Sequence, residues 1–440
     1  MTDDVFPSPD GVRGPILVPH LSGCDYYRDG LILVRQDGVV GYCGPFHESL
    51  VRDFGSIRTS RGVILPPFLD LHTHISQHPI RGKFTEGIEQ TTSEGRLLEG
   101  LKRNVYPAEA LCNDPNRAEK VIRDFLADTL RHGVVGGCAY MTSNVQATRL
   151  ALTILPDTWR VGMVLMDRPE VPENLRTDPG SVIGQMIELA EVFGDRFVVT
   201  DRFAPVVSKT LRRSAAKIAR RFNLFTQTHL NEQPSEKLLV EKVLYPDYPN
   251  YTSVYHRDGL FDSPCIVAHC VHMTTDEWDV FARSGAIIAH CPTSNLLLGS
   301  GRMDLDEVIR RKIQYALATD VGASPTVSML AEIGRFLQVH AGRSAYATPS
   351  EALYRATLAP QDILRMNALV GGLTIGQPAS FIEVKPLKNS SSDNAEECIA
   401  SLISDSLDDP ALTVQQVTLR GRCVFSADST GPNEYTACPT

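Results

Sequence analysis

Eight short apolar runs, separated by longer polar stretches, limit more than any other feature how this chain can fold. Unbroken apolar runs of this kind are typical of strands that are buried on both faces of a parallel sheet. Between them, residues 117–131, 210–222 and 276–283 place apolar side chains on one helical stripe. This alternation predicts an α/β fold, and eight such units predict a (β/α)8 TIM-like barrel, with an open doubly wound sheet as the alternative. The eight expected strands are 64–72, 134–141, 160–167, 196–203, 224–230, 265–272, 285–292 and 315–322.

Composition and charge exclude several classes of protein. The 440 residues are 42% hydrophobic and 22% charged, which is ordinary for a globular chain with a large core. A net charge of −9 argues against nucleic acid as a partner, because no basic stripe is present to neutralise phosphates. No apolar run approaches the roughly 20 residues that span a membrane, and the acidic start MTDDVFPSPD lacks the apolar segment of a signal peptide. Ten cysteines without a CxxC pair predict neither a zinc knuckle nor a disulfide framework, so we expect a cytoplasmic protein.

Histidine and aspartate residues gather at the ends of the expected strands. His72 and His74, in LDLHTH, point to the same face of a strand because side chains alternate. His229 ends the fifth run, His269 lies in the sixth and Asp320 closes the eighth. Barrels of this type carry their catalytic groups at the carboxyl ends of the strands. Any one of these side chains could be a core histidine or a helix cap, but five on one rim predict a metal site.

This pattern resembles the amidohydrolase superfamily, with HxH after the first strand, single histidines after the fifth and sixth, and an aspartate after the eighth. A longer set of segments, between about residues 64 and 380, resembles one branch of that superfamily, the guanine deaminases. NYTSVY is the most discriminating piece, because related deaminases generally lack this insert. The segments are HTHISQ (72–77), LLEGLKRNVYPAE (97–109), TDRF (200–203), THLNE (228–232), LYPDYPNYTSVY (244–255), AHCPTSNLLLGSG (289–301) and ATDVG (318–322).

The resemblance also implies a domain organisation. Residues 67–370 would form the catalytic barrel, and residues 1–66 and 371–440 would together form a small β-sandwich. Short β-like pieces near the amino terminus, within residues 16–43, fit such a second domain. The resemblance further implies a homodimer.

Carried over by position, the resemblance implies that His72, His74, His229 and Asp320 hold one zinc ion per subunit, with Fe2+ as the alternative. Three nitrogens and one carboxylate suit either ion and leave one position open for water. Dinuclear members of the superfamily place a bridging lysine at the end of the fourth strand, whereas this chain has Arg202 in that region. A mononuclear centre is therefore expected.

For catalysis, the resemblance implies a hydrolytic deamination of guanine to xanthine and ammonia. Asp320 and His269 would orient a water molecule and take its proton. Glu232 would carry a proton to the ring nitrogen and then to the departing ammonia, which requires a group that can both give and accept a proton.

For recognition of a small purine, the resemblance implies Gln77, Arg202, Phe203 and His269. The Gln77 amide can donate and accept at once, and the Arg202 guanidinium is a fixed fork of donors. Phe203 could stack on the flat ring or meet its edge.

Two departures from the guanine deaminase pattern bear on the substrate. Gly100 stands where LLEWL is common, and the lost indole would enlarge or loosen the pocket. Asp201 stands where TPRF is common and would add a charge beside Arg202. A larger aminated heterocycle, such as a pterin or 8-oxoguanine, is therefore an alternative substrate. An inactive scaffold and a hydrolase of cyclic amides or chlorinated triazines are further alternatives, against which the complete metal set and the NYTSVY insert argue.

Overall fold

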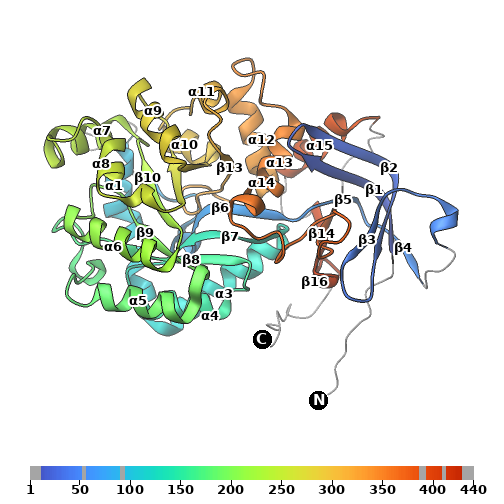
Figure 1. Ribbon diagram of the computed structural model, residues 1–440, viewed down its shortest axis with the longest axis horizontal. Helices are drawn as coiled ribbons and strands as arrows, with labels where there is room; N and C mark the ends of the chain where they lie inside the picture. The colour runs from blue at the N-terminus through green and yellow to red at the C-terminus, as the bar shows by residue number, and fades with distance from the viewer. Residues whose placement is uncertain (1–10, 52–55, 90–94, 386–392, 409–412, 429–440) are drawn as a thin grey trace.

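The structure is a computed structural model that describes residues 11–51, 56–89, 95–385, 393–408 and 413–428. Figure 1 shows a barrel wrapped by helices, with a second sheet lying beside it along the long axis of the molecule. In the described ranges, no helix has the length and apolar character needed to cross a membrane. The expectation about a signal peptide concerns residues 1–10, which lie outside the described residues.

Eight strands pair in parallel and in chain order, and they form the predicted (β/α)8 barrel (Figure 1). Backbone hydrogen bonds join the two ends of the row, since Asp320 N donates to His72 O at 2.9 Å and His74 N donates to Val321 O at 2.8 Å. This closure brings the aspartate of the last unit next to the histidines of the first. The strands are β6 (Phe68–His74), β7 (Val134–Tyr140), β8 (Trp159–Leu165), β9 (Phe197–Asp201), β10 (Thr226–Leu230), β11 (Cys265–His269), β12 (Ile287–His290) and β13 (Tyr315–Leu317).

The first expected strand, 64–72, is divided in the structure. Pro66 and Pro67 separate β5 (Val63–Leu65) from β6, because proline has no N–H to donate to a strand ladder. β5 pairs with β1 and β14 in the second sheet, whereas β6 belongs to the barrel. The proline pair therefore marks the passage of the chain from one sheet to the other.

The second sheet is mixed and combines strands from both ends of the described chain. Its order is β16-β15-β14-β5-β1-β2-β3, with β4 paired to β1. It has a small apolar core of its own, which includes Ile16, Ile32, Ile64 and Phe381. The exact division of the chain into residues 67–370 and the two flanks stays a prediction. The strands are β1 (Gly11–His20), β2 (Gly23–Val34), β3 (Val40–Pro45), β4 (Ile57–Thr59), β5, β14 (Phe381–Val384), β15 (Val414–Leu419) and β16 (Arg422–Ser426).

The three predicted helices are confirmed as α3, α6 and α9. α3 begins after Asp114, whose side chain accepts a hydrogen bond from Arg117 N at 2.9 Å. Its predicted apolar stripe, including Ile122 and Phe125, is buried. The helices are α1 (Arg96–Gly100), α2 (Tyr106–Ala110), α3 (Pro115–Arg131), α4 (Val145–Ile154), α5 (Val182–Phe193), α6 (Lys209–Phe222), α7 (Pro234–Leu239), α8 (Tyr251–Arg257), α9 (Thr275–Ser284), α10 (Pro292–Leu297), α11 (Leu305–Arg310), α12 (Met329–His340), α13 (Pro349–Ala356), α14 (Leu358–Ile363) and α15 (Ala395–Asp408).

Candidate active site

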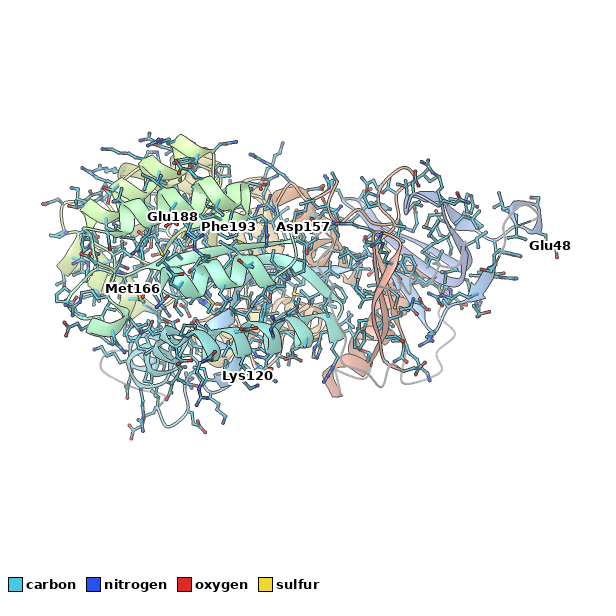
Figure 2. All side chains as sticks on the ribbon, turned by 90° about the horizontal axis from the view of Figure 1, so that it is seen from below. Glu48, Lys120, Asp157, Met166, Glu188 and Phe193 are labelled. Carbon is cyan, nitrogen blue, oxygen red and sulfur yellow. The ribbon has the colours of Figure 1, made fainter. Side chains whose placement is uncertain are left out.

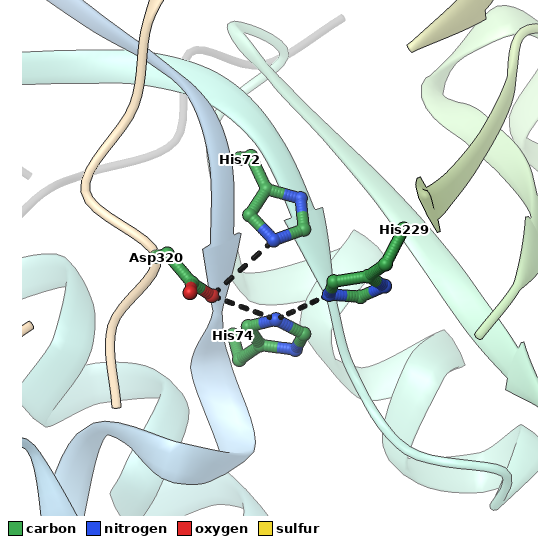
Figure 3. Close-up of side chains that lie close together, drawn as sticks. All are labelled: His72, His74, His229 and Asp320. Carbon is green, nitrogen blue, oxygen red and sulfur yellow. Dashed lines mark hydrogen bonds and ion pairs between the residues drawn. The ribbon is translucent and has the colours of Figure 1, made fainter. Parts of the chain in front are cut away.

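Four side chains that could together hold a metal ion converge at the carboxyl ends of the barrel strands (Figure 3). Asp320 Oδ1 lies 3.1 Å from His74 Nε2 and 3.3 Å from His72 Nε2. The Nε2 atoms of His74 and His229 lie 3.4 Å apart. Ligands at about 2.0–2.1 Å from one tetrahedral ion would be separated by about 3.3–3.4 Å. The spacing of the four side chains therefore fits a single metal ion.

Burial keeps these side chains in the state in which they bind metals. Loss of hydration lowers the pKa of His72 to about 4, and it also lowers the pKa of His74 and of His229. Burial alone would raise the pKa of Asp320, but the neighbouring imidazoles of His72 and His74 outweigh it and hold that pKa well below its usual range. The 3.3 Å contact of the buried His72 Nε2 with Asp320 Oδ1 lacks the geometry of a regular hydrogen bond, and a metal ion between the two atoms would satisfy both. Neutral imidazoles and an ionised carboxylate are the donors that a divalent ion requires.

The backbone around His229 orients its ring. His229 Nδ1 donates to Arg202 O at 2.6 Å, which leaves Nε2 facing the cluster. Tyr255, from the NYTSVY segment, donates through its hydroxyl to His229 O at 2.9 Å. The same hydroxyl accepts from Thr228 Oγ1 and from Ala204 N, each at 3.0 Å. The insert NYTSVY therefore holds the backbone of a predicted metal ligand, His229, through the Tyr255 hydroxyl.

Glu232 and His269 lie beside the cluster. Burial raises the pKa of Glu232 well above its usual value, and the charge of Asp320 raises it further. Glu232 Oε2 lies 3.5 Å from His269 Nε2, and Oε1 accepts from Ser300 Oγ at 3.4 Å. His269 Nδ1 donates to Asn295 Oδ1 at 2.9 Å, so its Nε2 faces the cluster. A buried acid in this position can hold a proton and exchange it with groups in the pocket.

Four non-glycine residues at or just after the strand ends of this rim have a left-handed backbone. The φ angles are 52° at Asn231, 74° at His269, 51° at Cys270 and 53° at Asp320. Such conformations cost energy and concentrate at functional sites, where the surrounding structure holds them.

A buried carboxylate on the polar side of the pocket fixes two predicted recognition residues. Glu109 Oε1 accepts from Gln77 Nε2 at 3.0 Å and from Arg202 Nη1 at 2.9 Å, and Oε2 accepts from the same Nη1 at 2.8 Å. Because a carboxylate only accepts, Gln77 must turn its NH2 group to Glu109 and its carbonyl oxygen away from it. Burial lowers the pKa of Arg202, but attraction to Glu109 outweighs this and raises the pKa above its usual value. Glu109 was not predicted as a site residue, although it ends the quoted segment 97–109.

One pocket lies at this site, and its empty space of about 340 Å³ includes solvent at its mouth. Every predicted site residue lines it except His72, which is fully buried. Phe203 is among the lining residues, as expected, and Phe84 joins it without having been predicted. The lining consists of His74, Gln77, Phe84, Leu97, Leu101, Arg202, Phe203, His229, Glu232, His269, Leu298 and Asp320.

The charge of Asp201, which we expected beside Arg202, does not face the pocket. Neighbouring residues at a strand end face opposite sides, and Asp201 Oδ2 accepts from Arg212 Nε at 2.7 Å, away from Arg202. Arg212 also donates to Asp258 at 3.2 Å and to the Tyr245 hydroxyl at 2.9 Å. The Asp201 carboxylate thus belongs to a buried network on the other side of the strand.

At Gly100, where we expected a lost indole to enlarge or loosen the pocket, the adjoining space is filled. A Cβ atom added there would lie only 2.5 Å from Phe84 Cε1, so the Phe84 ring already occupies the adjoining space.

A (β/α)8 barrel with a three-histidine, one-aspartate cluster and a buried acid at its carboxyl rim defines a metal-dependent hydrolase. The chain matches the amidohydrolase family over residues 63–424. It is 31% identical to the guanine deaminase of Escherichia coli, with 83% of each chain covered. It is 30% identical to the guanine deaminase of Homo sapiens, with 73% of this chain and 72% of the relative covered. The solved structure of the E. coli guanine deaminase is similar with a TM-score of 0.82 at 28% identity, covering 95% of this chain and 99% of that one.

The chain therefore belongs to the amidohydrolase family, in the branch that contains the guanine deaminases. It is a hydrolytic deaminase that acts on C–N bonds.

Proposed function

We propose that this protein is a zinc-dependent guanine deaminase, which converts guanine and water to xanthine and ammonia. The observation that carries the proposal is one pocket in which three members of the candidate metal cluster meet the buried acid Glu232 and the pair Gln77 and Arg202, which Glu109 fixes from behind the lining. The metal cluster alone would fit many hydrolases. The hydrogen-bond network adds a donor, Arg202, and an acceptor, the Gln77 oxygen, whose directions are fixed by Glu109.

Within this proposal, His72, His74, His229 and Asp320 hold one zinc ion. When bound, the ion supplies Lewis acidity, which lowers the pKa of water from 15.7 to about 7. The same donor set accommodates Fe2+, which is the alternative metal.

The chain's own groups manage the protons. Because burial holds the pKa of Glu232 well above its usual value, this side chain can carry a proton and release it within one turnover. It takes one proton from the attacking water and gives it to the ring nitrogen beside the carbon that bears the amine. It then takes the second proton from the hydroxyl group that the water has left on that carbon and gives it to the amine, so that the C–N bond breaks, ammonia leaves and the hydroxyl becomes the carbonyl of xanthine. His269, whose Nε2 lies 3.9 Å from Asp320 Oδ2, orients the water together with that carboxylate.

Recognition of guanine falls to the fixed polar groups. Guanine presents a carbonyl oxygen next to a ring N–H, and the Gln77 oxygen can accept from the N–H while Arg202 donates to the carbonyl. Phe203 offers an apolar surface to the ring. Adenine has an amine and a bare ring nitrogen at the corresponding positions, so it would leave both protein groups unpaired. Such a mismatch typically costs about 10⁴–10⁵-fold in kcat/KM.

Ammonia release from guanine, 8-oxoguanine, pterin, adenine and cytosine by the zinc-loaded protein tests the proposal. We expect guanine to have the highest kcat/KM, and xanthine to be the product. Pterin or 8-oxoguanine as the best substrate would contradict the choice of guanine but not the chemistry. A protein that binds one zinc ion and releases ammonia from none of the five would refute the deaminase proposal.

A further inference from the structure

We infer that Phe84 is the specificity-determining wall of the substrate pocket, and that Gly100 is the position that allows this wall to close. The inference rests on the proposed function and adds what selects a purine over a larger heterocycle. Phe84 lies in residues 82–87, here called the Phe84 segment, which precede α1 in the chain. It is only 6% exposed and lines the same pocket as Gln77 and Arg202.

Gly100 is needed for space and not for backbone conformation. Its φ of −60° is ordinary for a helix, a conformation in which glycine is less favourable than alanine. A Cβ atom at this position would lie 2.5 and 2.7 Å from two atoms of the Phe84 ring and 2.9 Å from Phe84 O. Even alanine would therefore require the Phe84 segment to shift, because the contact involves backbone as well as the ring.

The helical stretch after Gly100 holds the Phe84 segment in place. One turn further along, Asn104 Nδ2 donates to Phe84 O at 2.9 Å. Its neighbour Arg103 donates through Nη1 to Gly87 O at 2.7 Å. Gly100, Arg103 and Asn104 all meet the Phe84 segment, so together they form a single docking surface.

The other end of the segment is fixed to the metal side of the pocket. Gly82 N donates to Gly322 O at 2.9 Å, two residues beyond Asp320. Phe84 is thus held between the carboxyl end of the barrel and α1, which gives its ring one defined position.

An apolar wall is the element that can discriminate among the candidate substrates. Guanine, 8-oxoguanine and pterin share the same carbonyl and N–H edge, so Gln77 and Arg202 cannot separate guanine from pterin. The two differ in the size of the second ring. A pocket that is closed by a well-anchored aromatic side chain selects by this difference, and a misfit of one methylene is typically worth about 10- to 200-fold.

Phe84→Ala should raise KM for guanine and lower the guanine-to-pterin ratio of kcat/KM by about tenfold or more. Gly100→Ala should change the ratio in the same direction, because it displaces the Phe84 segment. Two control variants should leave the ratio unchanged. Gly184→Ala adds a Cβ atom in α5 that would meet nothing within 4 Å. Phe425→Ala removes a phenylalanine of the second sheet that is 7% exposed.

A rescue experiment separates a pocket wall from a purely structural side chain. In Phe84→Ala/Gly100→Trp, the indole has the space that the Phe84 ring left, and only the 2.9 Å contact of the new Cβ with the backbone oxygen of residue 84 requires a small shift. We therefore expect this variant to recover about tenfold in guanine kcat/KM relative to Phe84→Ala. Gly100→Trp alone should be less active than the double variant, because Phe84 occupies that space.

The results distinguish the inference from the proposed function. An active wild-type protein whose substrate ratio is unchanged by Phe84→Ala would overturn the inference alone, as would a double variant no better than Phe84→Ala. A wild-type protein inactive on guanine, 8-oxoguanine and pterin would overturn the proposed function and the inference with it.

Discussion

Replacing Glu109 with glutamine removes a negative charge at a point where three hydrogen bonds meet. Glu109 is fully buried and accepts from Gln77 Nε2 at 3.0 Å and from Arg202 Nη1 at 2.9 and 2.8 Å. Glutamine keeps the size of the side chain, but it has one acceptor oxygen and brings an NH2 group. It cannot satisfy both neighbours, so either Gln77 or Arg202 loses its partner.

Two costs follow from this geometry. Removing one partner of a buried ion pair costs about 3–5 kcal/mol, and because the amide oxygen keeps one bond to Arg202 we expect a loss of about 3 kcal/mol in the free energy of unfolding. In the pocket, Gln77 becomes free to turn its NH2 group toward the ring N–H of guanine. An unpaired buried donor costs about 1–3 kcal/mol, which at 1.4 kcal/mol per factor of ten lowers guanine kcat/KM by about 5- to 150-fold.

Urea unfolding and steady-state ammonia release measure the two costs, and Glu188→Gln is the matched control. Glu188 lies on the outer helix α5 (Figure 2), where it accepts from Arg149 Nη2 at 2.6 Å and its side chain is 59% exposed. An exposed pair of this kind contributes about 0–1 kcal/mol, so this variant should keep wild-type activity. Guanine kcat/KM within about threefold of wild type in Glu109→Gln would refute the orienting role of Glu109 derived from the geometry.

Three other outcomes follow from the site and the core. Chelation should abolish ammonia release and zinc should restore it, and free zinc at 1,000 times its Kd should stabilise the fold by about 4 kcal/mol; full activity of the metal-free protein would end the metal assignment. Glu232→Gln should keep one zinc ion per chain by elemental analysis but lose about 10²–10⁴-fold in kcat, because an amide delivers no proton; near-normal turnover would assign the proton transfer to another group. Burial raises the pKa of Glu332 from 4.5 to about 8, so the folded chain keeps a proton that the unfolded chain loses, and this stabilisation disappears as the pH rises through about 8. The urea stability of Glu332→Gln relative to wild type should therefore rise by roughly 2 kcal/mol between pH 6 and pH 8, and a constant difference would contradict the raised pKa.

The barrel could be predicted because its strands are buried on both faces and are therefore apolar at nearly every position. Hydrophobicity alone did not locate where each strand ends. The eighth run, 315–322, contains a strand only as far as Leu317, and the rest forms the turn that carries Asp320 on a left-handed backbone. Buried turns and buried strands share the same apolar residues, so the boundary depends on backbone pairing that a sequence pattern does not contain.

The site could be predicted where chemistry was tied to a strand end. His72 and His74 share a strand face by periodicity alone, and barrel topology brings His229 and Asp320 to the same rim. Glu109 was not predicted, because a glutamate in a helical run is usually solvated. Only the structure shows that it is buried and accepts hydrogen bonds from Arg202. The contact joins residues 93 positions apart, which no local pattern connects.

The two departures from the family pattern show how far a single position can be interpreted. Asp201 could have been assigned to the back of its strand, because Arg202 faces the pocket and side chains alternate. Gly100 is different, since the absence of a side chain indicates only that something approaches closely, and the structure identifies it as Phe84. Close-packed interiors leave few voids, so the volume of a missing aromatic ring is filled by a neighbouring side chain. A glycine at position 100 thus changes the substrate range only if the side chain at position 84 does not fill the space. The residues at positions 84 and 100 should therefore be compared together with the substrate preference of relatives.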